Sequence, residues 1–403
     1  MTFFSRLKSY FNAPQQTKVI YTPYPFASIP GMVDPQLIAS VFTNWRILSE
    51  TLSKLPIDIY KPDGSGGREV YTAHPLYDML HYNPNNYQTQ YQLFNGAELK
   101  RNQHGNSFVW IHRNPMTGRA ETLEQLFNID GYKIMNGNLY YSRVNISPGE
   151  PEIIPAEDIL HFKYIANDGI WGMNPIESLR LQINPLGKSF KTLDKFYENS
   201  AMTGRALKSQ VGTHNTQGMQ EATDKFNEKY GGYIEAGKLV PLPPNTEIQE
   251  LSLNIKDAEF ITSNLFSEKQ IYNLYGVPFI DENAKYSNIE QMLLHFKAST
   301  MGAIVRQYRQ ELEFKLLSLG ERKQNITIEF NINAMLESDT KSRIEYLTNL
   351  WKISVLSGNQ IADIENLPSF TGGDLRWVQS NNFKSLDQIQ VEYNAIEETQ
   401  RKK

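Results

Sequence analysis

Cysteine is absent from the 403 residues, which excludes disulfide bonds, thiolate metal clusters and cysteine nucleophiles. An excess of positive charge is also lacking, because 40 Lys and Arg stand against 44 Asp and Glu and the net charge is −4. Such a balance excludes a protein that coats nucleic acid through bulk charge. Any contact with nucleic acid must therefore be local.

Long apolar runs are missing as well. No segment reaches the roughly 18 apolar residues of a membrane-crossing helix, and Arg6 and Lys8 interrupt the apolar residues near the N-terminus. We therefore expect neither a secretory signal nor a membrane partner. Hydrophobic residues at 40% and charged residues at 21% are typical of a folded protein. The length predicts about two to three folding units.

Complete catalytic motifs are lacking too. Residues 232–238, GYIEAGK, match the start of a phosphate-binding loop, but Leu239 stands where Ser or Thr must hold Mg²⁺. Residues 187–189, GKS, lack the first glycine of that motif, and we expect them on a helix surface. The seven histidines form no HExxH motif, and His161 alternates with apolar neighbours as a half-buried strand residue does. The sequence thus predicts no catalytic residue, no metal site and no cofactor.

The first half of the chain has the pattern of an α+β fold. Helical spacing of apolar residues begins after Asp34-Pro35, a cap residue followed by a proline suited to the first helical position. Strand patterns are joined by short turns, which favours antiparallel hairpins over βαβ units. The predicted helices are 34–55 and 93–101, and the predicted strands are 56–61, 107–113, 137–144 and 159–165.

Helices dominate from residue 175 onward. Asn174-Pro175 and Asn184-Pro185 each predict a helix start, so we expect two successive helices there. The pattern that follows predicts a strand at 207–211, a helix at 216–230, a strand at 238–241 and a helix at 258–275 stopped by Gly276-Val-Pro278. The longest predicted helix, 288–319, carries Gly302 in its middle, where we expect a bend. A strand at 326–332 and a helix at 340–356 complete the pattern.

The polar segment FIDENAKYSN, residues 279–288, joins two predicted helices. Its Asn283, Lys285, Tyr286 and Asn288 could contact a phosphate backbone without reading bases. The alternative is a solvent-exposed turn between helices. One lysine is weak in a single copy, but a ring of subunits would present every copy toward its axis.

An ordered series of short motifs runs from about His74 to Asp374. The motifs are Pro84-Asn85 with Thr89, GNSFVWIHR at 105–113, EDILH at 157–161, DGIWGMNP at 168–175, ENSA at 198–201, AGKLVPL at 236–242, YGVP at 275–278, YSNIE at 286–290, and GGD at 372–374. In number, order and spacing this series resembles the portal proteins of long-tailed double-stranded-DNA bacteriophages. Asn359-Gln-Ile-Ala362 departs from the family pattern by lacking its charged pair, and Pro185 is unusual for a helix in that region.

The resemblance implies a portal fold with an α/β wing, a paired-helix stem, a small strand–helix–strand clip, a tunnel loop and a long kinked helix. The implied segments are an N-terminal arm (1–20), the wing (21–184 and 289–357), the stem helices (185–204 and 257–278), the clip (205–256), the tunnel loop (279–288), and a crown with a polar tail (358–403).

The resemblance also implies a function without catalysis. Portal proteins form rings of twelve at one capsid vertex, through which DNA is packaged and later ejected. The implied partners are other copies of the chain, double-stranded DNA, the terminase large subunit, a head–tail adaptor, and the major capsid and scaffolding proteins. The implied location is the virion's portal vertex, and the host cytoplasm during assembly. For docking of the motor or adaptor, the clip offers Lys208, Gln210, Lys225 and Lys229.

Two alternatives remain at this stage. One is another head–tail connector or minor capsid protein, which would share the absence of catalytic residues. The other is an enzyme that binds a nucleotide at residues 232–238.

Overall fold

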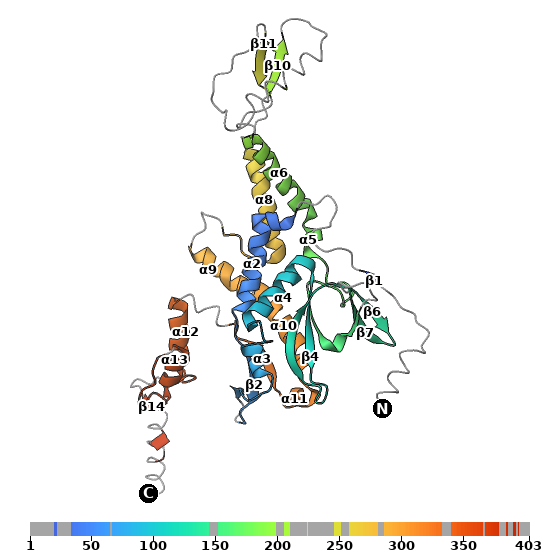
Figure 1. Ribbon diagram of the computed structural model, residues 1–403. Coiled ribbons are helices and arrows are strands. Elements are labelled where there is room, and N and C mark those ends of the chain that lie inside the picture. Colours follow the sequence, from blue (N-terminus) through green and yellow to red (C-terminus); the bar gives the residue numbers. More distant parts are fainter. Residues whose placement is uncertain are drawn as a thin grey trace. The chain divides into compact units, whose positions relative to one another are not determined.

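The computed structural model describes residues 20–21, 34–64, 67–144, 152–198, 205–209, 224, 246–250, 258–280, 286–332, 340–365, 367–378, 384–385, 390–391 and 394 (Figure 1). The chain divides into two compact units, residues 1–330 and 331–403.

In the described part of the chain, each strand runs antiparallel to the strands that it pairs with, as the short turns predict. The first unit holds a sheet of order β12-β2-β3, a second of order β5-β4-β9 and a third of order β1-β6-β7-β8. The strands are β1 (Ile20–Tyr21), β2 (Ile57–Pro62), β3 (Arg68–Val70), β4 (Asn106–Arg113), β5 (Ala120–Leu126), β6 (Ile129–Met135), β7 (Asn138–Arg143), β8 (Glu152–Pro155), β9 (Ile159–Lys163) and β12 (Thr327–Phe330).

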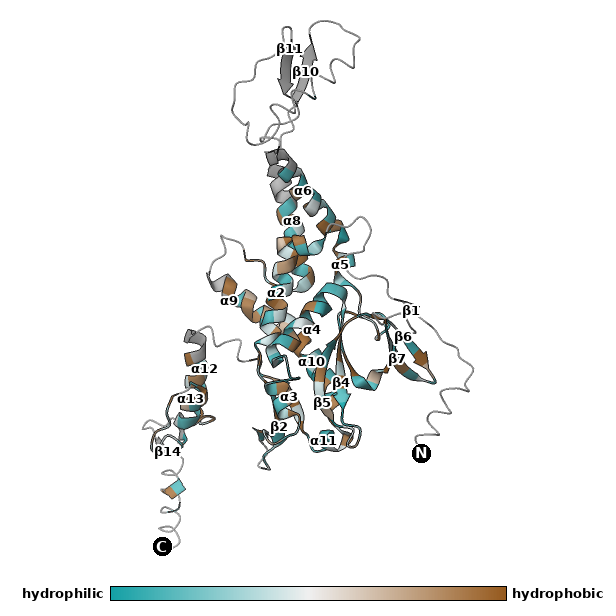
Figure 2. Ribbon diagram, in the orientation of Figure 1, coloured by the Kyte–Doolittle hydropathy of each residue, from teal (hydrophilic) through white to brown (hydrophobic). Residues whose placement is uncertain are grey.

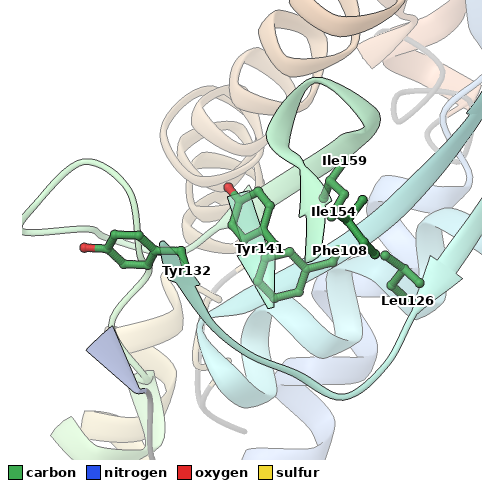
Figure 3. Packing of buried hydrophobic residues seen from close by; sticks show 6 residues of the cluster. All are labelled: Phe108, Leu126, Tyr132, Tyr141, Ile154 and Ile159. Carbon is green, nitrogen blue, oxygen red and sulfur yellow. The ribbon is translucent and has the colours of Figure 1, made fainter. Parts of the chain in front are cut away.

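A hydrophobic cluster joins the second and third sheets. Its buried members are Phe108, Leu126, Tyr132, Tyr141, Ile154 and Ile159. Figure 3 shows the rings of Phe108 and Tyr141 next to each other, and their centroids are 5.3 Å apart in an edge-on arrangement. Burial of this apolar surface fixes how the two sheets pack.

Three helices pack near the sheets, namely α2 (Ala39–Ser53), α3 (Tyr77–His81) and α4 (Gln90–His104). Thr89 and Gln92 form a capping box at the start of α4, and Gly105 ends it with a φ of 79°. The start of α2 differs from the prediction. Asp34 caps a short 3₁₀ turn, Pro35–Leu37, and α2 itself begins after the extended Ile38.

The predicted helix start at Asn184-Pro185 is wrong. The short α5 (Pro175–Ser178) is capped by Asn174 as predicted, but α6 runs unbroken from Arg180 to Glu198 with Pro185 inside it. Pro185 is exposed, so water can satisfy the carbonyl that its missing N–H leaves free. Ile183 and Leu186, both buried, hold the helix in place on either side of it. The predicted boundary between wing and stem therefore falls within one helix.

The insert between α6 and the next helix begins and ends with paired strands. β10 (Arg205–Ser209) pairs with β11 (Thr246–Glu250), and Lys208 lies opposite Glu247. The sequence predicted β10 two residues late and missed β11, whose polar sequence TEIQE has little apolar content. The predicted helix at 216–230, apart from residue 224, and the predicted strand at 238–241 lie outside the described residues.

Helix α8 (Ala258–Tyr275) has the predicted bounds and contacts both α6 and α2. The long helix that follows the loop consists of α9 (Tyr286–His295), a π-helical segment (Phe296–Met301) and α10 (Gly302–Leu316). A short α11 (Leu319–Lys323) then leads into β12. The π-helical segment ends where Gly302 begins α10.

The second unit contains α12 (Thr340–Lys352), α13 (Gly358–Ile364) and the paired strands β13 (Trp377–Val378) and β14 (Lys384–Ser385). Asn359 organises it, because its Oδ1 accepts the N–H of Phe370 at 2.9 Å and its N–H donates to Gly373 O at 2.8 Å. Helix α12, which the resemblance places within the wing segment 289–357, belongs to this second unit.

Candidate channel loop and the scaffold that holds it

The structure describes some of the predicted site residues. Asn283, Lys285, Gln210, Lys225, Lys229 and the motif at 232–238 lie outside the described residues. Tyr286 is the first residue of α9 and Asn288 lies in its first turn, with their backbone described. Lys208 is the fourth of the five residues of β10, and Gly302 is the first residue of α10.

The helix before the loop ends at a fixed point. Gly276 adopts a φ of +67°, and the N–H of Val277 donates to Tyr272 O at 3.1 Å. A Cβ at position 276 would lie 2.5 Å from Thr300 Oγ1, so both the conformation and the close approach require glycine. Buried Val277 then directs the chain into Pro278.

Thr300, in the π-helical segment, bonds to the chain just after α8. Its Oγ1 donates to Gly276 O at 2.8 Å. Within the same segment, Ser299 Oγ donates to His295 O at 2.7 Å. The segment 277–299 contains the candidate channel loop, residues 279–288. One side-chain hydrogen bond therefore closes this segment at its base.

Helix α10 is anchored to the edges of two sheets. Glu311 Oε1 accepts the N–H of His161 in β9 at 3.0 Å, and Glu313 Oε1 accepts the N–H of Ile328 in β12 at 3.1 Å. Both strands are edge strands, whose outward backbone groups need partners. Tyr308 adds a stacked contact with Phe162, with centroids 3.9 Å apart and planes 7° apart.

A buried polar node lies on the other side of β9. Asn106 Nδ2 donates to Gly172 O at 2.8 Å, and Asn106 Oδ1 accepts the N–H of Gly172 at 2.7 Å. His161 Nε2 lies 2.9 Å from the same Oδ1, and its Nδ1 lies 2.8 Å from Tyr141 Oη. Because Oδ1 can only accept, His161 carries its proton on Nε2 and accepts from Tyr141 on Nδ1. The neutral imidazole is thereby fully satisfied.

Two glycines of the motif series allow this node to form. A Cβ on Gly105 would lie 2.1 Å from Met173 O, and one on Gly172 would lie 2.0 Å from Gly105 O. Asp168 orders the segment between them by accepting the N–H groups of Ile170 and Trp171, each at 2.8 Å, and the hydroxyl of Tyr132 at 2.9 Å. GN at 105–106, His161 and DGIWGMNP thus form one structural unit.

Burial sets the charge states around the node. It lowers the pKa of His161 well below its ordinary value, and nearby Lys163 and Lys315 lower it further. Burial also lowers the pKa of His104 to about 4. Both imidazoles are therefore neutral near pH 7. His161 is more deeply buried than the half-buried strand residue expected from its neighbours.

The helices before and after the insert are joined by polar contacts. Ser189 on α6 is buried and lies within hydrogen-bond distance of the Asn264 amide on α8. The expectation of a helix surface at GKS is therefore wrong for Gly187 and Ser189 and holds for Lys188, which is exposed. At the end of α8, Tyr275 Oη accepts from Trp45 Nε1 at 2.8 Å and donates to Asn102 O at 3.1 Å.

Within the described ranges, no three His, Asp or Glu side chains gather in a way that could hold a metal ion. None of the described helices combines the length and apolar character needed to cross a bilayer. The geometry of this region forms a scaffold. Two sheets anchor α10, and α10 continues through the π-helical segment into α9, which leads back to the loop.

A family model described as phage portal protein matches residues 39–366. The chain belongs to the phage portal protein family. This match covers most of the chain and decides for a portal over other connector or minor capsid proteins.

Relatives agree with this assignment. The portal protein of Enterobacteria phage HK97 is 22% identical over 362 residues, covering 86% of this chain and 84% of its own. A probable portal protein of Streptomyces phage phiC31 is 22% identical over 339 residues, covering 81% and 72% respectively.

Solved structures share the fold. A chain in the virion of a native gene transfer agent particle matches with a TM-score of 0.55 at 16% identity, covering 92% of this chain and 100% of that one. An HK97-family portal protein from Corynebacterium diphtheriae matches with a TM-score of 0.55 at 11% identity, covering 78% and 99%. The predicted α+β portal fold is confirmed.

Sequence reasoning missed the residues that hold the loop. No sequence pattern pointed to Thr300, because its partner is the backbone carbonyl of Gly276, just after α8. The π-helical segment did have a recognisable pattern. Phe296 and Met301, both buried, are five residues apart, which is the spacing that a π turn places on one face. Asn106, His161 and Asp168 were quoted as motif residues, but their convergence could not be read from spacing.

Proposed function

We propose that this portal protein assembles into a closed ring, expected to hold twelve copies, with residues 279–288 facing an axial channel for double-stranded DNA. The supporting observation is the scaffold around the loop. A hydrogen bond between Thr300 and Gly276 closes its base, and α10 is fixed to two sheet edges. The base of the arm that carries the loop is thus fixed, while α9 itself has large exposed side chains.

The charge of the chain suits a conduit. DNA must slide, and each phosphate bound by a cation would strengthen attachment and slow that movement. The net charge of −4, with Lys285 as the one cation in residues 279–288, gives a weakly adhesive lining. Asn283, Tyr286 and Asn288 would add contacts to the DNA backbone that do not depend on base sequence.

The remaining partners follow from the same proposal. ATP hydrolysis belongs to a separate motor, the terminase large subunit, and this chain itself catalyses no reaction. The insert 205–256 would contact that motor during packaging and a head–tail adaptor afterwards, through Lys208, Gln210, Lys225 and Lys229. The ring would sit at one vertex among the capsid and scaffolding proteins after assembly in the host cytoplasm.

Native mass spectrometry with imaging of the same sample tests the ring. Twelve copies of 46.3 kDa would give a particle of about 556 kDa. Neighbouring copy numbers remain compatible, because any interface that joins two different faces of the subunit and closes on itself makes a ring. A stable monomer or dimer at assembly concentrations would contradict the proposal.

A double substitution tests the loop. Lys285→Ala with Tyr286→Ala should leave the ring mass unchanged and lower the amount of packaged DNA. The matched control is Lys188→Ala, an exposed lysine on α6. Normal packaging by the double variant would remove the loop from the mechanism.

A further inference from the structure

An exposed apolar and basic surface lies at the end of the long helix that is distant from the loop. It comprises Met116, Arg119, Phe314, Leu319, Arg322 and Lys323, which we call the rim patch. Met116 is 95% exposed, Leu319 70% and Phe314 64%. Single exposed apolar residues are ordinary, but several large ones on neighbouring segments that also carry cations are typical of an interaction site.

The hairpin that carries Met116 has a defined conformation. Asn114 Oδ1 accepts the N–H groups of Met116 and Thr117 at 2.8 and 3.1 Å, and the N–H of Asn114 donates to Arg119 O at 2.8 Å. Met116 is therefore held at the tip of a closed turn. Its exposure is a property of the fold.

Two contacts join this hairpin to the end of α10 and to α11. Arg113 donates to Lys315 O at 2.9 Å, and Arg119 lies 4.0 Å from Glu321 Oε1. Figure 1 shows α11 beside the turn end of the β4 strand. Residues from two distant parts of the sequence thus contribute to one surface.

The charge of the rim patch is positive. The Arg322 guanidinium lies 5.7 Å from the centroid of the Phe314 ring, and Lys323 is exposed. Two acids lie beside these cations, and both make internal bonds. Glu321 accepts the N–H and the hydroxyl of Ser318 at 2.8 and 2.7 Å and lies 3.3 Å from His74, and Glu121 accepts from Asn114 Nδ2 at 2.6 Å. Arg119, Lys323 and the three apolar side chains are therefore exposed, and Arg322 is partly buried against Phe314.

We propose that the rim patch docks another protein through a segment that is acidic and amphipathic. The apolar residues would bury the partner's apolar side chains, and Arg119, Arg322 and Lys323 would pair with its carboxylates. A protein partner is favoured over DNA because apolar side chains, which a phosphate backbone cannot use, make up half of the surface.

The orientation of the patch rests on the proposed function. The helix from Tyr286 to Leu316 has segments of 10, 6 and 15 residues, so at 1.5 Å per residue its ends are up to about 45 Å apart. If residues 279–288 face the channel, the rim patch lies at the outside of the ring. There it would meet proteins that surround the portal, and it stays clear of the DNA path.

Fluorescence anisotropy with two designed peptides tests the proposal on the full-length protein. The first probe is a 20-residue amphipathic peptide of Glu, Leu and Ala, and the second has Lys in place of every Glu. We expect the Glu peptide to bind at least about tenfold more tightly than the Lys peptide. Equal affinities for the two peptides would overturn the proposal.

Variants assign any binding to the patch. Phe314→Ser with Leu319→Ser should lower affinity for the Glu peptide at least about tenfold, and Arg119→Glu with Lys323→Glu should abolish the preference for it. Ile165→Ser, at another exposed apolar residue, is the control and should change nothing. Unchanged affinity in both double variants would overturn the proposal. So would a 20-base-pair duplex that displaces the Glu peptide and loses affinity in the same variants.

The mass of each variant distinguishes a failure of the rim patch from a failure of the proposed ring. A ring of wild-type mass without the peptide preference would overturn only the rim patch. A protein that forms no ring but binds the Glu peptide through these residues would support the patch and contradict the proposed function.

Discussion

The two halves of the long helix are held in opposite ways. In α10 the residues Ile304, Tyr308, Leu312 and Leu316, each four positions after the last, are buried. In α9 the large side chains Leu293 and Leu294 are about half exposed, and His295 is exposed. Figure 2 shows that α9 is nevertheless rich in hydrophobic residues.

This difference places the boundary between anchored and free helix at the π-helical segment. Phe296 and Met301 are its buried members, and they share a face because a π turn aligns residues five apart. Beyond Phe296, toward the loop, the described side chains of α9 have few burial partners within the subunit. One helix therefore combines a fixed base with an arm that carries the candidate channel loop.

The largest expected effect comes from the anchored half. Tyr308→Ala removes a fully buried ring that stacks on Phe162, and it should lower the free energy of unfolding by about 3–5 kcal/mol. Leu293→Ala in α9 is the matched control and should cost less than about 1 kcal/mol. Chemical denaturation of both variants measures the contrast, and equal losses would remove the distinction between the two halves.

The polar node should come next. Asn106→Leu leaves the backbone groups of Gly172 and the Nε2 of His161 without their partner, at a cost of about 2–4 kcal/mol. Asn273→Leu, at an exposed position on α8, should be close to neutral. If Asn106→Leu lowers the free energy of unfolding by less than about 1 kcal/mol in the same denaturation curves, the polar node does not stabilise the sheet.

A one-residue deletion tests the boundary itself. Removing Ala298, which is exposed, should convert the π turn into α-helix and leave Phe296 and Met301 four apart on one face. Stability should change by less than about 1 kcal/mol. Removing the exposed Gln310, which lies between Tyr308 and Leu312, should cost at least about 2 kcal/mol because it rotates one half of the buried stripe of α10 against the other. Thermal unfolding compares the two. A deletion of Ala298 as damaging as that of Gln310 would contradict the account.

The smallest effect is a pH dependence. Burial lowers the pKa of His104 to about 4 and that of His161 well below its ordinary value, so the unfolded chain binds more protons below pH 6.5 than the folded one. Stability should therefore be constant above about pH 6.5 and fall toward pH 4. His104→Gln should flatten the decline, and exposed His295→Gln should not. Stability that rises on acidification through this window would contradict these pKa directions.

Local rules predicted much of the fold. Gly276-Val-Pro278 ended α8 where expected, and alternating residues found β4, β7 and β9. Pro185 misled, because on this exposed face water can bond the carbonyl that the proline leaves without a partner, and the helix continues through it. β11 was missed, since a short polar strand is defined by its partner more than by its own residues.

The site was less predictable than the fold. Asn106 and Gly172 are 66 positions apart, and His161 and Glu311 are 150 apart, so their bonds depend on tertiary packing. Thr300 and Gly276 meet only after the chain has reversed through the loop. The motif series identified the family because it includes several of these residues in a fixed order. No single spacing in it predicted which of them are in contact.

Distances between copies in the assembled ring test the central claim most directly. Because the chain has no cysteine, Asn283→Cys and Met116→Cys each offer one site for a spin label. The spacing of neighbouring copies grows with distance from the axis, so the account predicts a shorter spacing for position 283 in the loop than for position 116 in the rim patch. Equal spacings, or a shorter spacing at position 116, would contradict a loop that faces the channel.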